Sequence, residues 1–323
     1  MRALLQSAYG EADTLTMGDV PVPTPGKGQV LVRVAAASVN AADVFLMRGV
    51  PRAVRPGIGL RRPVRRRLGV DLAGVVADVG SGVTRWRVGD AVFGQGIATF
   101  AEFALADGHR LAELPDGVRP EHAAALPIAG TTAMCAVDVA KVERGQRVVV
   151  TGVAGGVGQF AAQLAALRGA DVIGVCSGRN VERVRALGIE HVLDYETQDP
   201  LDTAAPYDAV IDNAGGVRIR DWRRVVARGG AILPNSGVHG PDGGALMRVV
   251  KAQWHGLVAP QRVRVLFPTV TTERLTELGQ LLATDRIRLL VDTVFTLDRA
   301  PEALAAVGTH HARGKVIVTQ RVR

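Results

Sequence analysis

The sequence predicts an α/β protein in which a doubly wound parallel sheet is joined to a second domain built as a small β-barrel. The parallel sheet is indicated by a strand, glycine turn and helix over residues 148–168, and by the alternation of strands and helices that continues to residue 267. The barrel is indicated by short strands between residues 1 and 105, which Gly and Pro interrupt at regular spacing. A chain of 323 residues is long enough for about two such domains.

The glycine turn at the centre of the chain predicts a cofactor site. The strand before it, 148–150, is short, apolar and β-branched, as central parallel strands are. Its glycines follow G-x-x-G-x-x-G from Gly152, because Val153 interrupts the more common G-x-G-x-x-G spacing. The helix that begins there would point free N–H groups at an anion, which predicts a dinucleotide pyrophosphate; the alternative is a glycine-rich packing turn. The predicted contacts are Gly155, Gly156, Val157 and Gly158.

The other elements follow from apolar periodicity and from Gly and Pro breaks. The first part of the chain predicts strands and one short helix that ends at Arg48, the strands lying over residues 3–5, 29–34, 68–80, 88–94 and 101–105. The middle part predicts helices over 120–126, 131–141, 156–168, 181–187 and 222–228, and strands over 171–176, 191–193, 207–212, 230–233 and 262–267. The last part predicts helices over 272–283 and 300–307 and strands over 291–295 and 315–319, which we expect to rejoin the barrel.

Composition narrows the class of protein. No apolar run reaches the roughly 18 residues of a membrane span, and the N-terminus lacks a signal peptide with a cleavage site, so we expect a cytoplasmic protein without membrane contact. Two cysteines, Cys135 and Cys176, fit a reducing compartment and offer no metal framework. The low aromatic content of 4% argues against a stacking platform for single-stranded nucleic acid.

The net charge of +8 is concentrated in one stretch, because eight arginines lie between Arg48 and Arg67. The simplest interpretation is a solvated loop. A site entrance that attracts an anionic cofactor or substrate is an alternative. Nucleic-acid binding is a third, which we do not expect.

The end of the second strand of the βαβ unit bears on which nicotinamide cofactor is bound. An NAD site needs a carboxylate at this point for the ribose hydroxyls. No Asp or Glu lies between Val172 and Val181, whereas Ser177 and Arg179 offer a hydroxyl and a cation that suit a 2′-phosphate. We therefore predict NADPH; the alternative is that Arg179 is a solvated residue at a helix N-terminus.

Several stretches, in the same order along nearly the whole chain, resemble the medium-chain dehydrogenase/reductase superfamily and within it the zinc-independent quinone oxidoreductases, the ζ-crystallin-like group. They are residues 38–43, 69–76, 88–90, 114–116, 130–133, 155–158 and 186–188. The resemblance implies a GroES-like β-barrel catalytic domain over 1–125, a Rossmann domain that binds NADPH over 126–267, and a return to the catalytic domain over 268–323. It also implies that the substrate lies between the two domains.

The resemblance also implies that the catalytic metal of the zinc alcohol dehydrogenases is absent. Ser38 or its neighbours take the place of a cysteine ligand, and Gly69-Val70-Asp71 stands where those enzymes have Gly-His-Glu. The four-cysteine structural lobe is missing as well, and two distant cysteines cannot build either zinc site.

By family position, Asn40 and Thr132 are expected near the nicotinamide and the substrate as the catalytic residues. Further contacts to the cofactor carry over by position at Tyr195, Asn213, Asn235, Ser236 and Lys315. For most of these the alternative is an ordinary role at a helix end or in a turn. Phe45 stands in a region where several quinone reductases have tyrosines, and no tyrosine occurs between Tyr9 and Tyr195. This excludes a tyrosine proton donor from that region.

The function implied is hydride transfer from NADPH to a small molecule, either a quinone or an α,β-unsaturated carbonyl compound. Two alternatives stay open: a pathway-specific enoyl reductase, and a cofactor-binding structural or RNA-binding protein with little turnover. The resemblance further implies a homodimer in which the strand over 262–267 pairs edge to edge with its copy.

Overall fold

The computed structural model describes residues 1–52, 55–64, 68–236, 240–309 and 313–320. It divides into two compact units. The first contains Met1–Thr131, Val270–Arg286 and Val291–Arg323, and the second contains Thr132–Thr269 and Ile287–Leu290. Each unit has its own hydrophobic core and is described separately.

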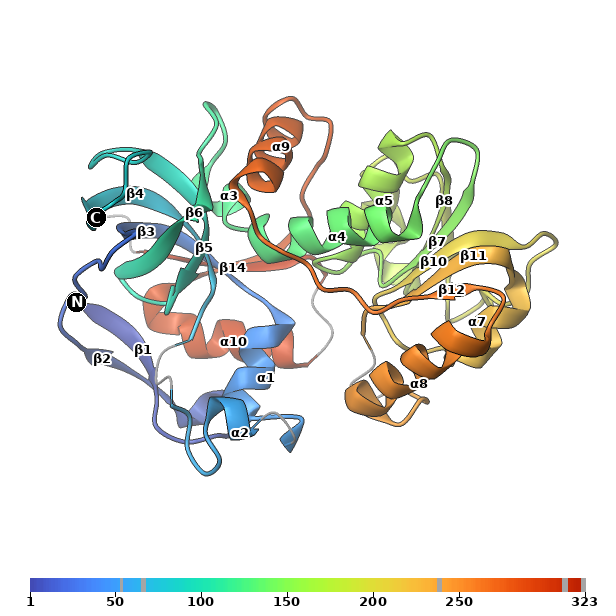
Figure 1. Cartoon of the computed structure of the whole chain (residues 1–323), viewed down its shortest axis with the longest axis horizontal. Helices are drawn as coiled ribbons and strands as arrows, with labels where there is room; N and C mark the ends of the chain where they lie inside the picture. The colour runs from blue at the N-terminus through green and yellow to red at the C-terminus, as the bar shows by residue number, and fades with distance from the viewer. Residues whose placement is uncertain (53–54, 65–67, 237–239, 310–312, 321–323) are drawn as a thin grey trace. The chain divides into compact units, whose positions relative to one another are not determined.

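The first unit is a β-barrel (Figure 1). Its six-stranded sheet has the order β13-β14-β3-β4-β5-β6, and a second pairing between β3 and β6 closes the barrel. The strands are β3 (Gln29–Val39), β4 (Asp71–Val79), β5 (Ala91–Ile97), β6 (Phe103–Glu113), β13 (Val291–Thr296) and β14 (Lys315–Thr319). The strands β1 (Arg2–Gln6) and β2 (Leu15–Asp19) form a separate antiparallel pair. The helices that belong to this unit are α1 (Ala41–Arg48), α2 (Arg55–Ile58), α3 (Pro120–Ala123), α9 (Thr272–Ala283) and α10 (Ala300–Gly308).

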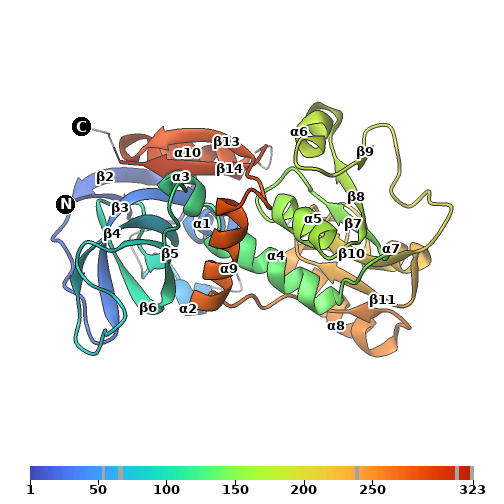
Figure 2. The same cartoon turned by 90° about the horizontal axis from the view of Figure 1, so that it is seen from above.

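The second unit is a parallel sheet with the strand order β12-β11-β10-β7-β8-β9. The strands are β7 (Arg147–Thr151), β8 (Asp171–Cys176), β9 (His191–Asp194), β10 (Tyr207–Asp212), β11 (Val226–Pro234) and β12 (Arg262–Val263). The helices are α5 (Gly158–Leu167), α6 (Val181–Arg185), α7 (Ile219–Val225) and α8 (Gly244–Val258), and α4 (Pro127–Ala140) contains the boundary between the units. Figures 1 and 2 show α5 and α7 on opposite faces of the sheet.

The strand order reverses between β7 and β10. From β7 the chain adds β8 and β9 on one side, and from β10 it adds β11 and β12 on the other. Ligands of doubly wound sheets bind at the carboxyl ends of the strands at such a switch point. The ends of β7 and β10 are therefore the place where a cofactor is expected.

The predicted fold class is confirmed, and the differences in detail have local causes. The strand predicted from residue 68 begins at Asp71, because Gly69 has φ +98° and a Cβ there would lie 2.7 Å from the Phe100 amide nitrogen. The strand predicted over 262–267 is only Arg262–Val263. Among the helices in the described part of the chain, none has both the length and the apolar content that a membrane crossing requires.

Three short segments belong to a different unit from the one predicted: residues 126–131 belong to the barrel unit, and residues 268–269 and Ile287–Leu290 belong to the parallel sheet unit. Residues 268–323 were expected to return to the barrel, but Ile287–Leu290 packs with the parallel sheet unit. Two buried glutamines of α5 hold it there: Gln163 accepts a hydrogen bond from the Arg288 amide at 2.7 Å, and Gln159 accepts one from the Leu290 amide at 2.6 Å. Each carboxamide also donates to a carbonyl of the same segment, so the segment is bound much as an added strand would be.

Candidate functional site

The glycine turn after β7 has the geometry of an anion site. Gly152 has φ +61°, and Gly158, the first residue of α5, lies so close that a Cβ on it would be 2.2 Å from the Gly152 carbonyl oxygen. Gly155 is partly exposed, and a Cβ there would be 3.1 Å from the same oxygen. Within the described chain no side chain caps the start of α5. The Gln159 amide donates to the Gly155 carbonyl at 3.3 Å. Other N–H groups in the first turn of the helix are available to a ligand such as a pyrophosphate, which the turn fits.

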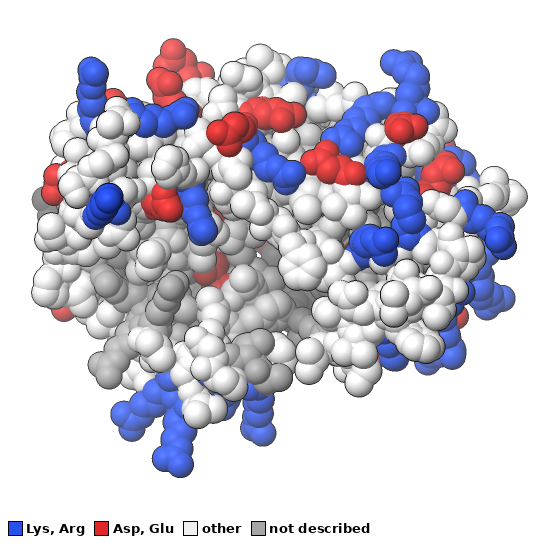
Figure 3. Space-filling view, in the orientation of Figure 1, with Lys and Arg blue, Asp and Glu red and all other residues white. Residues whose placement is uncertain are grey.

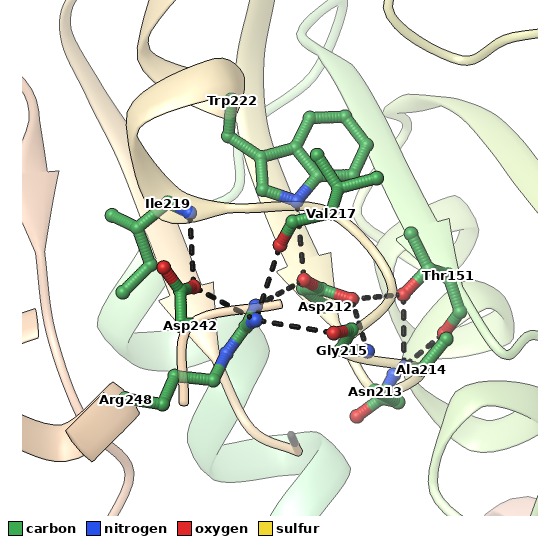
Figure 4. A network of polar contacts seen from close by, with 10 residues as sticks. All are labelled: Thr151, Asp212, Asn213, Ala214, Gly215, Val217, Ile219, Trp222, Asp242 and Arg248. Carbon is green, nitrogen blue, oxygen red and sulfur yellow. Dashed lines mark hydrogen bonds and ion pairs between the residues drawn. The ribbon is translucent and has the colours of Figure 1, made fainter. Parts of the chain in front are cut away.

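At the switch point, the Asp212 carboxylate joins the ends of β7 and β10 (Figure 4). Its Oδ1 accepts hydrogen bonds from the Thr151 hydroxyl at 2.5 Å and from the Gly215 amide at 2.9 Å. The Thr151 hydroxyl in turn accepts from the Ala214 amide at 3.1 Å. Thr151 directly precedes the glycine turn, so one buried carboxylate fixes the residue before that turn and the turn that follows β10.

Two of the predicted cofactor contacts, Asn213 and Asn235, meet at this edge of the sheet. The Asn235 amide group donates to Asn213 Oδ1 at 2.8 Å, and Asn213 Nδ2 donates to the Thr151 carbonyl at 3.2 Å. The backbone amides of Asn235 and Ser236 both donate to the Asp212 carbonyl, at 3.0 and 3.2 Å. The polar ends of β7, β10 and β11 thus form one connected row, as parallel strands that end at the same edge allow.

At the end of β8, the structure adds a carboxylate that sequence reasoning missed. Ser177 is buried and accepts a hydrogen bond from Asn180 Nδ2 at 3.0 Å, whereas Arg179 is exposed. Asp194, the last residue of β9, lies opposite Cys176, and a Cβ on Gly178 would be 2.6 Å from its Oδ2. Asp194 lies outside residues 172–181, where the sequence argument expected an NAD-binding carboxylate, although its place at the end of the neighbouring parallel strand was a signal for it. Tyr195, the next residue, is 58% exposed.

In the first unit, a buried polar cluster surrounds Asn40, the residue before α1. Lys315 Nζ donates to Asn40 Oδ1 at 2.7 Å, and Asn40 Nδ2 donates to Asp71 Oδ2 at 2.8 Å. The Ser38 hydroxyl donates to the same Asp71 oxygen at 3.0 Å, and the Ile128 amide donates to the other at 3.2 Å. The amide of Asn40 is therefore held at both ends, by an ammonium group and by a carboxylate.

Three ionisable groups of this cluster lie out of contact with water. Burial raises the pKa of Asp43 to about 7, although the Asn40 amide donates to its Oδ2 at 2.9 Å. Burial also raises the pKa of Asp71, with the Lys315 ammonium acting in the opposite direction. The pKa of Lys315 is lowered by burial, against the attraction of Asp71 and Asp43. Because two carboxylates share one ammonium, a protonated Asp43 leaves the cluster neutral overall.

Thr132 and the described residues of the basic stretch 48–67 lie outside the two polar networks described above. Thr132 is 6% exposed and lies in the interior of α4, not at the helix N-terminus. Of the basic stretch 48–67, Arg48 is paired with Glu11 at 2.8 Å and Arg55 stacks on Tyr9 at 4.7 Å from the ring centre. Arg52, Arg61 and Arg62 are exposed, and residues 65–67 lie outside the described chain. Figure 3 shows basic side chains projecting from the surface near α2.

Comparison with known proteins supplies the family. The GroES-like domain of alcohol dehydrogenases matches residues 26–116, and the family described as zinc-binding dehydrogenase matches residues 187–318. The chloroplastic quinone-oxidoreductase QR1 of Triphysaria versicolor is 31% identical over 98% of both chains. The chain belongs to the medium-chain dehydrogenase/reductase superfamily, in its quinone oxidoreductase group.

Two further comparisons support the same family. The mitochondrial NAD(P)H oxidoreductase RTN4IP1 of Homo sapiens is 29% identical, with 90% of this chain and 81% of that protein covered. The solved structure of the quinone oxidoreductase from Coxiella burnetii matches with a TM-score of 0.87, at 31% identity over 99% of both chains. The predicted family is confirmed, and the protein is an NAD(P)H-dependent oxidoreductase that uses a nicotinamide cofactor.

One of the matching families is described as zinc-binding, but the residues around Asn40 in this chain do not suit a zinc ion. The cluster at Asn40 offers a hydroxyl, an amide and carboxylates but neither a thiol nor an imidazole, and the Lys315 ammonium lies 3.9 Å from Asp71 Oδ2. A cation of the protein's own therefore already neutralises Asp71, and a divalent ion there would be repelled. Within the described ranges, no three His, Cys, Asp or Glu side chains group in a way that could hold a metal ion.

Lys315 lies in a different setting from the one that its family position implied. It was expected to bind a cofactor phosphate, but its side chain is 2% exposed and its ammonium contacts Asn40 and Asp71. The start of β14 brings it there, because β14 pairs with β3 so that Val316 and Ile317, the residues after Lys315, lie opposite Val39 and Ser38. A role in holding Asn40 is what this position supports.

The buried Asp43 predicts a specific pH dependence of stability. Since the pKa of Asp43 in the folded protein, about 7, is above the ordinary aspartate value of 3.8, its stabilising contribution is full below pH 4 and is lost as the pH rises to 7. Relative to Asp43→Asn, the free energy of unfolding of the wild type should fall over this range by up to roughly 4 kcal/mol. Urea unfolding at several pH values measures this, with the exposed Asp19→Asn as a control for the loss of one charge. A difference that does not change between pH 4 and 7 would contradict the assignment.

Proposed function

We propose that the protein is an NADPH-dependent, zinc-independent reductase that acts on a quinone or on an α,β-unsaturated carbonyl compound. The observation that carries the proposal is the Lys315–Asn40–Asp71 cluster, in which an amide held by charged groups occupies the region where zinc enzymes of the superfamily have metal ligands. Relatives support both substrate classes: QR1 is named a quinone oxidoreductase, and a tomato relative at 28% identity is named 2-methylene-furan-3-one reductase.

The chemistry requires a group that stabilises negative charge on oxygen. When bound, the nicotinamide supplies a hydride from C4 of its ring, and a proton from solvent completes the reduction of a quinone to a quinol. Asn40 Nδ2 donates one hydrogen to Asp71 and carries a second that can be donated to the substrate oxygen. Since Lys315 fixes the carbonyl end of the same amide, the donor is held in place before the substrate arrives.

Preference for NADPH is proposed from the charges at the end of β8. Arg179 is exposed and can pair with a 2′-phosphate, and the buried Ser177 hydroxyl lies two residues before it. The Asp194 carboxylate beside Gly178 acts in the opposite direction, because it repels a phosphate and accepts from ribose hydroxyls. The attraction between Arg179 and the 2′-phosphate outweighs the repulsion from Asp194, so NADPH is preferred.

Turnover by the purified protein in the presence of a chelator tests the function. We expect NADPH oxidation by a simple quinone or by an enone. Asn40→Ser should lower kcat by about 100-fold, since one donor to a developing oxyanion is lost. Serine is also a good N-cap residue, so α1 should keep its start, although the loss of the amide that contacts Lys315 and Asp71 should lower the melting temperature. Tight NADPH binding without turnover of either substrate would contradict the reductase and favour the non-enzymatic alternative.

Selection of the cofactor is tested at Arg179. In Arg179→Gln the Kd for NADPH should rise about tenfold or more, because a charge-assisted contact to phosphate is lost. The Kd for NADH should stay nearly the same. Fluorescence titration measures both, with the exposed Arg220→Gln as the matched control. Equal changes for the two cofactors, or none for either, would count against the assignment.

We infer a homodimer formed through the edge strand β12 and the neighbouring helix α8. β12 ends the sheet, and α8 exposes large apolar side chains to water, among them Leu246, Val250, Trp254 and Leu257. Light scattering should give twice the chain mass of 34.0 kDa. The double substitution Trp254→Glu and Leu257→Glu should give monomers, because dimerisation would then bury unpaired carboxylates in the interface. A wild-type monomer at micromolar concentration would refute the inference.

A further inference from the structure

The guanidinium of Arg248, on α8, is buried at the carboxyl edge of the parallel sheet. The side chain is 2% exposed and lies between the Asp212 and Asp242 carboxylates (Figure 4). Its Nη2 donates to Asp212 Oδ2, and its Nη1 donates to Asp242 Oδ2 at 3.1 Å. The same Nη1 also reaches the carbonyls of Gly215 at 3.3 Å and Val217 at 3.1 Å, in the turn that follows β10.

Asp212 transmits this contact to the cofactor edge. Its Oδ2 accepts hydrogen bonds from the Arg248 guanidinium and from the Trp222 indole, the latter at 3.1 Å. Its Oδ1 accepts hydrogen bonds from the Thr151 hydroxyl and from the Gly215 amide. Thr151 and Asp212 are register partners on β7 and β10, the two strands that flank the switch point. The residue before the glycine turn and the turn after β10 are therefore both placed by a carboxylate whose own position Arg248 sets.

Stability alone gives a weak reason for this arrangement. Burying an ion pair costs about as much in lost hydration as the pair regains, so apolar residues would serve a core as well. Arg248 Nε is buried without a hydrogen-bond partner among the described residues, which adds a further cost. Asp242 is shared with Lys251, at 3.5 Å, so the four charges balance. What the network achieves is a fixed geometry of the two turns.

We propose that Arg248 is a positioning residue for the nicotinamide cofactor. Through Asp212 it sets the separation between the glycine turn and the 213–215 turn, and so determines how tightly the part of the cofactor common to NADPH and NADH is bound. The inference rests on the nicotinamide cofactor of the family and not on the choice of substrate or on the 2′-phosphate preference.

The test measures cofactor affinity and compares variants of different chemistry. In Arg248→Met, the Kd for NADPH and the Kd for NADH should both rise by roughly tenfold or more, because a small displacement of the turns weakens every contact to the shared part. The KM for the cofactor should rise with little change in kcat, which is the signature of lost binding. Arg224→Met, an exposed arginine of α7, is the matched control and should leave both values unchanged.

Two further variants separate positioning from folding. Arg248→Lys keeps the charge but cannot span both carboxylates, and it should raise both Kd values less than the Met variant does. The double substitution Asp212→Asn and Arg248→Met removes the buried pair together, so it leaves no uncompensated Asp212 charge, yet it should still bind both cofactors weakly. Folding is followed by circular dichroism. A folded Arg248→Met or double variant with wild-type Kd values would overturn the proposal, and so would a loss confined to NADPH.

Discussion

A carboxylate that is buried away from water must be neutralised where it stands, and this requirement organises both units of the protein. In the parallel sheet unit, Asp212 at the switch point is neutralised by Arg248, and the pair fixes the turns that follow β7 and β10. In the barrel unit, Asp71 is neutralised by Lys315, and the pair fixes the amide of Asn40. In each case the charged pair is not itself the group that would meet a ligand; it holds backbone amides or a side-chain amide that would.

Under the proposed function, this division of roles is how a member of a superfamily that includes zinc enzymes would act without a metal. A Lewis acid stabilises negative oxygen directly. A fixed amide does so by hydrogen bonding, and the benefit depends on its being oriented in advance. Lys315 and Asp71, which are buried beside Asn40, hold the amide in that orientation. The pKa of Asp43 is raised to about 7 because the same region excludes water.

Much of this could be predicted from the sequence, and what could not depends on contacts distant along the chain. The strand, glycine turn and helix at 148–168 are local, and so were readable. Asn40 and Asn213 were predicted by family position, but the contact between Asn40 and Lys315 was not predicted, because the two residues are 275 positions apart. Arg248 on α8 was missed, although a single arginine among apolar residues at 245–250 was a visible signal. Asp194 was missed because it belongs to β9 and not to the end of β8. The placement of Ile287–Leu290 was missed because this segment lacks strand periodicity.

We propose that a nicotinamide cofactor binds at the carboxyl ends of β7 and β10, on turns held by Asp212. Amide hydrogen exchange with and without NADPH tests it most directly. We expect slowed exchange of the amides at 155–158 and 213–215, with little change in β1 and β2, the separate strand pair of the other unit. Unchanged exchange at 155–158 with NADPH bound, or protection confined to another part of the protein, would contradict the account.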